Sequence, residues 1–279
     1  MIRTYYLLTK PGIIVGNLIT TVAGFVLASG GHFDLLLFLA TLAGLGCIIA
    51  SACVFNNYID RESDKKMART QNRPLVKGLI SGKSAISFAI VLGLIGFTTL
   101  VRFTNLLAVS MAVVAFVIYV AMYSFWKHRT SYATLIGSIS GAMPPVVGYC
   151  AASHRFDMGA AILFLILVLW QMPHFFSIAM YRLSDYRAAS IPVLPVKSGN
   201  QKTKVHMVWY IVGFFFATLM LIVFNYTSAV YLFTVPLLGL AWLLLCIKGF
   251  KTDNDTAWAR QMFRFSLVVI TATCAMTCI

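Results

Sequence analysis

The chain has few charged residues and very few acidic ones. Charged side chains make up 11% of its 279 residues, and only 8 residues are Asp or Glu, whereas a soluble domain carries about 25% charged residues. Apolar residues reach 60% and recur along the whole length in runs long enough to cross a bilayer. This scarcity of charge excludes a water-soluble globular protein and predicts a polytopic α-helical membrane protein.

The six cysteines form no C-x-x-C pair, and all of them lie inside or at the edge of apolar runs. The sequence therefore lacks the spacing that is typical of a dithiol redox site or a thiolate zinc site. We interpret the cysteines as small residues buried in the membrane.

The apolar runs predict nine transmembrane helices that form one all-α domain over residues 1–279. Spans joined by short loops bury their backbone polar groups only as a single bundle, so a second domain is not expected. Pro144 and Pro145 predict a break in the fifth span. The runs cover residues 11–29, 35–58, 84–101, 105–125, 132–152, 159–181, 206–225, 228–247 and 262–279.

Basic residues are concentrated in alternate connections between the spans. With the N-terminus inside, twenty of the 22 Lys and Arg residues fall in cytoplasmic segments, and only Arg102 and Arg155 fall outside. Cytoplasmic loops carry the excess of Lys and Arg, so this distribution predicts that the two long loops, 59–83 and 182–204, are cytoplasmic. It also accounts for the net charge of +14 without nucleic-acid binding.

A polar stripe follows the second span. Asn56, Asp60 and Asp64 are spaced i, i+4 and i+8, so a helix that continues past the span would place them on one face. Two carboxylates one turn apart repel each other unless a cation lies between them, and Mg²⁺ binds such carboxylates together with phosphate oxygens. The spacing predicts a Mg²⁺–diphosphate site; the alternative is a solvated helix end with mixed ion pairs.

Basic residues close to the stripe are expected to neutralise the diphosphate. In the first long loop these residues are Lys65, Lys66, Arg69 and Arg73. The second long loop adds Asp185 with Arg187 and Lys197, and this cluster is expected to complete a clamp around the same anion.

The sixth span contains the polar segment Trp170-Gln171-Met172-Pro173-His174. An ionisable residue inside a span is a functional candidate, so we expect Trp170, Gln171 and His174 to line a substrate cavity. A hydrogen bond from His174 to a neighbouring helix is the alternative. Asn17 and Tyr123 are expected to line the same interior.

Several segments resemble a known family. The pattern Asn56-x-x-x-Asp60-x-x-x-Asp64 after the second span resembles the first aspartate-rich motif of the UbiA-type intramembrane prenyltransferases. Within that family, further segments are similar to the haem-farnesylating members, above all the bacterial ones, in order along nearly the whole chain. These segments are Thr9–Ile13, Asn56–Asp60, Arg69–Leu75, Trp170–His174 and Asp185–Pro195.

The resemblance implies a nine-helix bundle around a lateral cavity and a Mg²⁺-dependent ionisation of farnesyl diphosphate. The farnesyl group would pass to a vinyl group of haem b, and addition of water would give haem o. Asn56, Asp60 and Asp64 match the first motif and Asp185 the start of the second, which implies catalytic and metal-binding roles for all four. Ala189 stands where the second motif has a later acid, so a second fully acidic metal site is not expected.

The resemblance also implies a location and partners. The location would be the bacterial inner membrane, with the site loops on the cytoplasmic side. His174 would ligate or position the haem, and the product would pass to a terminal oxidase or a haem a synthase. Two alternatives stay open: a UbiA-type aromatic prenyltransferase of a quinone pathway, which has no evident use for His174, and a secondary transporter, which would carry acids near the membrane midplane.

Overall fold

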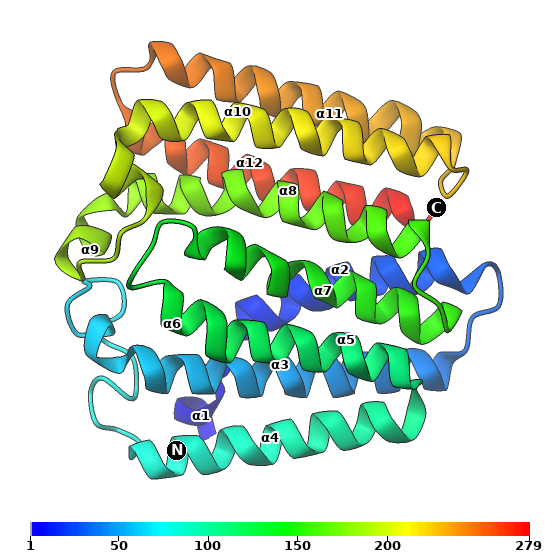
Figure 1. Cartoon of the computed structure of the whole chain (residues 1–279), viewed down its shortest axis with the longest axis horizontal. Helices are drawn as coiled ribbons and strands as arrows, with labels where there is room; N and C mark the ends of the chain where they lie inside the picture. The colour runs from blue at the N-terminus through cyan, green and yellow to red at the C-terminus, as the bar shows by residue number, and fades with distance from the viewer. Residues whose placement is uncertain (1) are drawn as a thin grey trace.

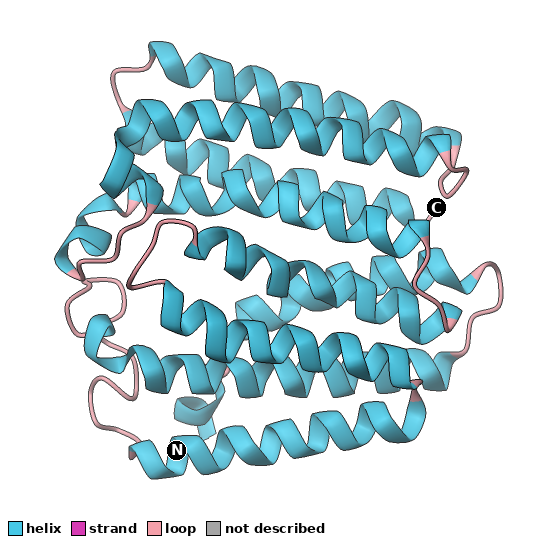
Figure 2. Cartoon of the chain, in the orientation of Figure 1, coloured by secondary structure: helices cyan, strands magenta, loops and turns pink. Residues whose placement is uncertain are grey.

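The computed structural model describes residues 2–279, and in that range it consists of helices and connections without a strand (Figure 2). The long helices run side by side as one bundle (Figure 1). The elements are α1 (Ile2–Leu8), α2 (Pro11–Ser29), α3 (Leu35–Asp64), α4 (Gly82–Phe103), α5 (Leu106–Val117), the π-helix η1 (Ile118–Tyr123), α6 (Ser124–Trp126), α7 (Ala133–Ser153), α8 (Met158–Tyr181), α9 (Leu183–Ala188), α10 (Leu194–Val223), α11 (Ala229–Lys248), the 3₁₀ turn η2 (Gly249–Lys251) and α12 (Asp255–Thr277).

Eight helices within residues 2–279 are long and apolar enough to cross a membrane. The ninth expected span corresponds to α12, which is helical and packs against α2, α8 and α11. Arg260 and Arg264 make the first half of α12 more polar than the other spans. The all-helical membrane fold is therefore confirmed, while the count of nine spans stays a prediction.

The helix carrying the polar stripe continues past the expected membrane boundary. The apolar run ends at residue 58, but α3 extends to Asp64, so Asn56, Asp60 and Asp64 share one helix as the spacing predicts. The second long loop is shorter than expected, because α9 forms within it and α10 already begins at Leu194. A non-helical residue, Gly199, with φ 78° and ψ 169°, interrupts the first turns of α10.

The expected break at Pro144 and Pro145 is wrong, since α7 runs without interruption from Ala133 to Ser153. The two prolines lack backbone N–H groups, so two helical hydrogen bonds are lost. α7 is enclosed by α2, α5 and α8, and this packing holds the helix together.

The core lies where the central helices meet. α8 packs against α7, α10 and α12, and small residues allow close approach elsewhere in the bundle. Gly44 on α3 faces Gly96 on α4, where a Cβ atom on Gly96 would collide with the Gly44 carbonyl oxygen. The bundle thus fixes α3, which carries Asn56, Asp60 and Asp64, and α8, which carries Trp170, Gln171 and His174.

Candidate active site

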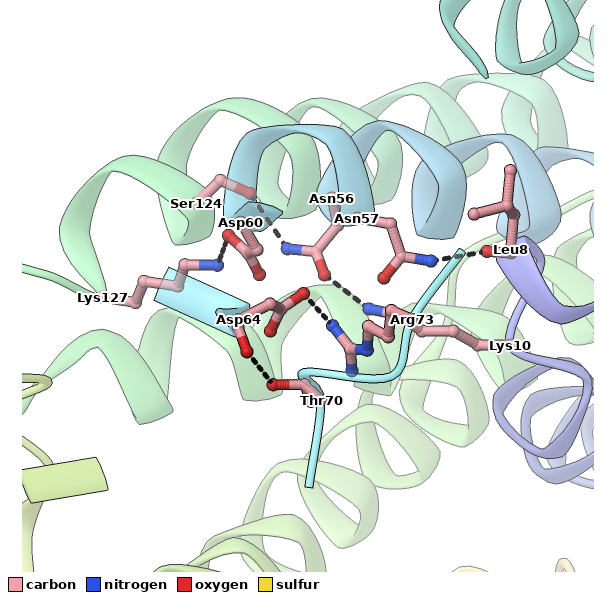
Figure 3. A network of polar contacts seen from close by, with 10 residues as sticks. All are labelled: Leu8, Lys10, Asn56, Asn57, Asp60, Asp64, Thr70, Arg73, Ser124 and Lys127. Atoms are coloured by element: carbon pink, nitrogen blue, oxygen red, sulfur yellow. Dashed lines mark hydrogen bonds and ion pairs between the residues drawn. The ribbon is translucent and has the colours of Figure 1, made fainter. Parts of the chain in front are cut away.

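Each polar residue of the stripe on α3 is paired with a cation from another segment (Figure 3). Lys10 Nζ donates a 2.6 Å hydrogen bond to Asn56 Oδ1. Asp60 forms an ion pair with Lys127. Asp64 Oδ2 lies 2.5 Å from the guanidinium of Arg73. Three hard oxygen donors therefore meet three positive charges in one place.

Lys10 is held in a strained conformation at the start of α2. Its φ of 52° and ψ of 65° lie in the left-handed region, which is uncommon for a residue other than glycine and costs free energy. Pro11 follows directly and takes the first position of α2. Burial lowers the pKa of the Lys10 ammonium to about 8, because the charged form is poorly solvated there.

Lys127 reaches the stripe at the end of the fourth span, directly after the short helix α6 that follows the π-helix η1. The π-helix η1 carries Tyr119 and Tyr123, whose rings stack with centroids 5.6 Å apart. Ser124 follows directly: its Oγ donates to the carbonyl of Tyr119 at 3.2 Å and accepts from Asn56 Nδ2 at 3.4 Å. π-helical segments are frequent at functional sites. This one connects the fourth span to the stripe.

The first long loop folds back under the end of α3. Thr70 Oγ1 donates to the carbonyl of Asp64 at 3.0 Å, which fixes the loop segment that carries Arg73. Asp185 on α9 accepts a 3.0 Å hydrogen bond from the backbone N–H of Ala68. This contact between Asp185 and the loop backbone joins the two long loops, while a clamp around the anion stays a prediction.

The basic residues expected around the diphosphate divide into two groups. Arg73 contacts the stripe directly. The other five are exposed to solvent: Lys65, Lys66, Arg69, Arg187 and Lys197. Lys65 pairs with Glu62 at 2.9 Å on the outer side of α3.

The sequence does not predict the contacts that Lys10, Lys127 and Ser124 make with the stripe. Both lysines lie next to a span, where the distribution of charge indicates only membrane orientation. A basic residue directly before the proline that opens a span was the available signal for Lys10. No sequence signal marked Ser124.

His174 lies inside the bundle and has a partner on α12. Its Nδ1 is 2.8 Å from Ser266 Oγ, and its ring stacks on Trp170 with centroids 4.8 Å apart. Ser266 Oγ also donates to the carbonyl of Phe263 at 2.6 Å. Because that bond uses the hydroxyl hydrogen, Nδ1–H of His174 is the donor to Ser266. The lone pair on Nε2 of the neutral ring then accepts no hydrogen bond from residues 2–279.

Two of the remaining cavity candidates, Gln171 and Asn17, bond to helix backbone. Gln171 Nε2 donates to the carbonyls of Ser138 and Leu167 at 3.2 and 3.1 Å. Asn17 Nδ2 donates to the carbonyl of Ile13 at 2.7 Å. Tyr123 is placed at the stripe, with the Lys127 ammonium 5.5 Å from its ring centroid.

The oxygen atoms of the stripe suit a metal ion that takes its remaining ligands from water and from a bound diphosphate. Asn56, Asp60 and Asp64 supply hard oxygens at the helical spacing, yet within residues 2–279 no three His, Cys, Asp or Glu side chains converge on one point. A site with two carboxylates suits Mg²⁺, which keeps waters and takes phosphate oxygens. Such a site would bind and polarise a diphosphate.

Comparison with known proteins identifies relatives that match nearly the whole chain. The sequence is 57% identical to the protoheme IX farnesyltransferase of Protochlamydia amoebophila, over 97% of this chain and 95% of that one. It is 53% identical to the protoheme IX farnesyltransferase of Edwardsiella ictaluri, over 99% and 94% of the two chains.

Solved structures share the fold. That of a digeranylgeranylglyceryl phosphate synthase superposes with a TM-score of 0.82 at 19% identity, over 99% of this chain and 97% of that one. A UbiA homologue from Archaeoglobus fulgidus bound to GPP and Mg²⁺ gives a TM-score of 0.71 at 16% identity, over 99% and 100% of the chains. The UbiA prenyltransferase family profile matches residues 17–268, so the chain belongs to the UbiA prenyltransferase family.

Proposed function

We propose that this membrane enzyme transfers the farnesyl group of farnesyl diphosphate to a vinyl group of haem b, releases diphosphate, and yields haem o after addition of water. Binding of the diphosphate is supported by the stripe, because Asn56, Asp60 and Asp64 each contact a cation. The acceptor half is supported by identities of 51–57% to proteins named protoheme IX farnesyltransferase.

The diphosphate would be bound by an exchange of partners. Lys10, Arg73 and Lys127 can only donate hydrogen bonds. In the structure they donate to the oxygens of the stripe. Mg²⁺ bound to the stripe would supply Lewis-acid stabilisation of the leaving diphosphate. The three side chains then turn their N–H groups to the phosphate oxygens, where they stabilise the charge that develops as the allylic C–O bond breaks.

The acceptor would lie beside the sixth span. His174 is fixed by Ser266 and Trp170, so the direction of its free Nε2 lone pair is set before haem arrives. Neutral imidazole is a usual haem ligand, and the ring either ligates the iron or positions the macrocycle. The stacked rings of Tyr119 and Tyr123 at the stripe provide a π surface on which an allylic cation is stabilised.

We place both long loops on the cytoplasmic side of a bacterial inner membrane, because twenty of the 22 basic residues lie at that end of the spans. Haem o would pass from there to a terminal oxidase or a haem a synthase. The orientation can be tested with single cysteines at two exposed positions. His32 lies in a connection at the opposite end of the spans, and Asn72 lies in the first long loop. A membrane-impermeant thiol reagent added to intact cells should label only the cysteine at position 32.

The competing proposal within the family is prenylation of an aromatic acid on a quinone pathway. The Trp170–His174–Ser266 cluster favours haem, because a small phenolic acid needs no imidazole inside the bundle. A competition assay separates the two: equal concentrations of haem b and 4-hydroxybenzoate are offered with farnesyl diphosphate and Mg²⁺. Haem o as the main product supports the proposal, and a prenylated benzoate as the main product contradicts it.

A further inference from the structure

Arg182 is a cation at the end of α8 that the site described above does not use. Its Nε is buried and has no hydrogen-bond partner within residues 2–279. No carboxylate in that part of the chain forms an ion pair with its guanidinium. A buried donor of a charged group that lacks a partner is costly, so its retention requires an explanation.

Acids of the two joined loops are engaged with other groups. Asp185, three residues later, accepts from the backbone N–H of Ala68. Asp64 is taken by Arg73. The guanidinium of Arg182 therefore offers its donors to a carboxylate from outside the chain.

A strip of aromatic rings leads from Arg182 into the bundle between α8 and α12. The guanidinium lies 5.4 Å from the ring centroid of Tyr181, and Tyr181 packs edge-on against Phe263 at 5.8 Å. Phe263 lies 4.9 Å from the His174 ring, which stacks on Trp170. The strip is aromatic along its length and cationic at the loop end, so it matches a flat aromatic ligand with an anionic edge.

We propose that Arg182 binds a propionate carboxylate of the porphyrin substrate. The inference rests on the proposed function, because it takes haem b as the acceptor. Arg182 follows His174 by eight residues, about 12 Å along a helix axis, which is comparable with the reach from the centre of a porphyrin to the end of a propionate arm. Carboxylate and guanidinium form the paired, charge-assisted hydrogen bonds that an orphan Nε–H and its neighbouring N–H can donate.

This anchor sets the orientation of the acceptor. In haem b the vinyl groups lie on the edge opposite the propionates, so a propionate at Arg182 directs the vinyl edge into the bundle. On α3 the spacing is the same: Asn56 lies eight residues before Asp64, the last residue of the helix. Asn56 is therefore as far from the end of α3 as His174 is from Arg182. Because α3 and α8 end on the same side of the bundle (Figure 1), the vinyl edge reaches the depth at which the farnesyl carbon leaves its diphosphate.

The test compares haem b with its dimethyl ester, which keeps the iron and both vinyl groups but lacks the carboxylates. Both ligands are titrated by absorbance into the full-length protein, with wild type, Arg182→Ala, Arg182→Gln and the exposed control Lys202→Ala. Hydrogen bonds to charged groups contribute about 1.5–3 kcal/mol, equivalent to about 10–100-fold in affinity. Wild type and Lys202→Ala should prefer haem b to the ester by that factor.

Arg182→Ala and Arg182→Gln should lose the preference through weaker binding of haem b, with ester affinity unchanged, which also shows that the variants are folded. Retention of the preference in either folded variant overturns the inference. Haem o formation by wild type is measured on the same preparation. Its absence contradicts the proposed function, whereas haem o formation together with an unchanged ester preference in the variants contradicts the propionate site alone.

Discussion

Lys10 and Asn56 lie 46 positions apart in the chain and meet in a 2.6 Å hydrogen bond. Lysine can only donate, so the amide oxygen of Asn56 must face Lys10 and the amide nitrogen must face the opposite way. On that opposite side Ser124 accepts from Asn56 Nδ2, while its own hydrogen is used by the carbonyl of Tyr119. The two contacts together fix the Asn56 oxygen toward the site.

Ser124 should therefore affect the requirement for Mg²⁺ more than the maximal rate. Ser124→Ala removes the acceptor that orients Asn56, at a cost of about 1 kcal/mol, so half-maximal activity should require about fivefold more Mg²⁺. Ser124→Thr keeps the Oγ and serves as the matched control. Its added methyl has room, because Ser124 lines a groove of about 390 Å³ with Ile59 and Phe125. An unchanged Mg²⁺ requirement in folded Ser124→Ala would show that Asn56 needs no such support.

The stripe predicts a sharp contrast among three acids of α3. Asp60→Asn and Asp64→Asn each remove a carboxylate without changing side-chain shape, so product formation should fall by about 10²-fold or more. Glu62→Gln should have little effect, because Glu62 is exposed and pairs with Lys65. Steady-state rates with farnesyl diphosphate and haem b, on variants checked for monodispersity, give the comparison. Equal damage from Glu62→Gln and Asp60→Asn would contradict a stripe-specific role.

Loss of the Lys127 side chain should make the thermal stability of the protein depend more strongly on Mg²⁺. Removing one partner of a buried ion pair costs about 3–5 kcal/mol, and the Lys127 and Asp60 side chains are only 8% and 13% exposed. Lys127→Met should therefore lower the thermal unfolding temperature in EDTA, and Mg²⁺ should restore more of that loss than it adds to wild type.

Arg129→Met is the matched control for Lys127→Met. Arg129 lies two residues further on, is exposed, and stacks on Phe125 at 3.7 Å. Arg129→Met should not change the Mg²⁺ response. A Lys127→Met protein whose unfolding temperature is equally low with and without Mg²⁺ would separate Lys127 from the metal site.

Hydrophobic runs and helical spacing predicted the parts of the molecule that depend on local sequence. The first span, residues 11–29, coincides with α2, since membrane burial is read directly from apolar runs. The common face of Asn56, Asp60 and Asp64 followed from their spacing.

The partners of the stripe could not be predicted in the same way. Lys65 and Lys66 were favoured for their proximity along the chain, yet α3 ends at Asp64 and both side chains are exposed. Lys10 and Lys127 flank helices that meet α3 only in the folded bundle, and they lie 46 and 67 residues away from their partners. Hydropathy and periodicity carry no information on which helices become neighbours. For the same reason, Ser266 as the partner of His174 was not predicted.

His174 should contribute to haem binding and not only to packing. His174→Ala should weaken haem b binding or shift its absorption spectrum, while Mg²⁺-dependent binding of farnesyl diphosphate persists, because the stripe lies on another helix. Ser177→Ala removes a buried hydroxyl that bonds the Pro173 carbonyl on the same helix and is the matched control. Absorbance titrations of the three proteins provide the measurement. Identical spectra and haem affinities in wild type and His174→Ala would remove His174 from the acceptor site.

The central claim is that a diphosphate site on α3 and a haem site beside α8 serve one reaction. Its most direct test is incubation of the purified full-length protein in detergent with haem b, farnesyl diphosphate and Mg²⁺, followed by mass spectrometry of the extracted porphyrins. We expect a haem that has gained one farnesyl group and one hydroxyl group, formed only when all three components are present and lost in Asp60→Asn. Unmodified haem b after incubation with folded, monodisperse protein, or a product that forms equally well in Asp60→Asn, would contradict the account.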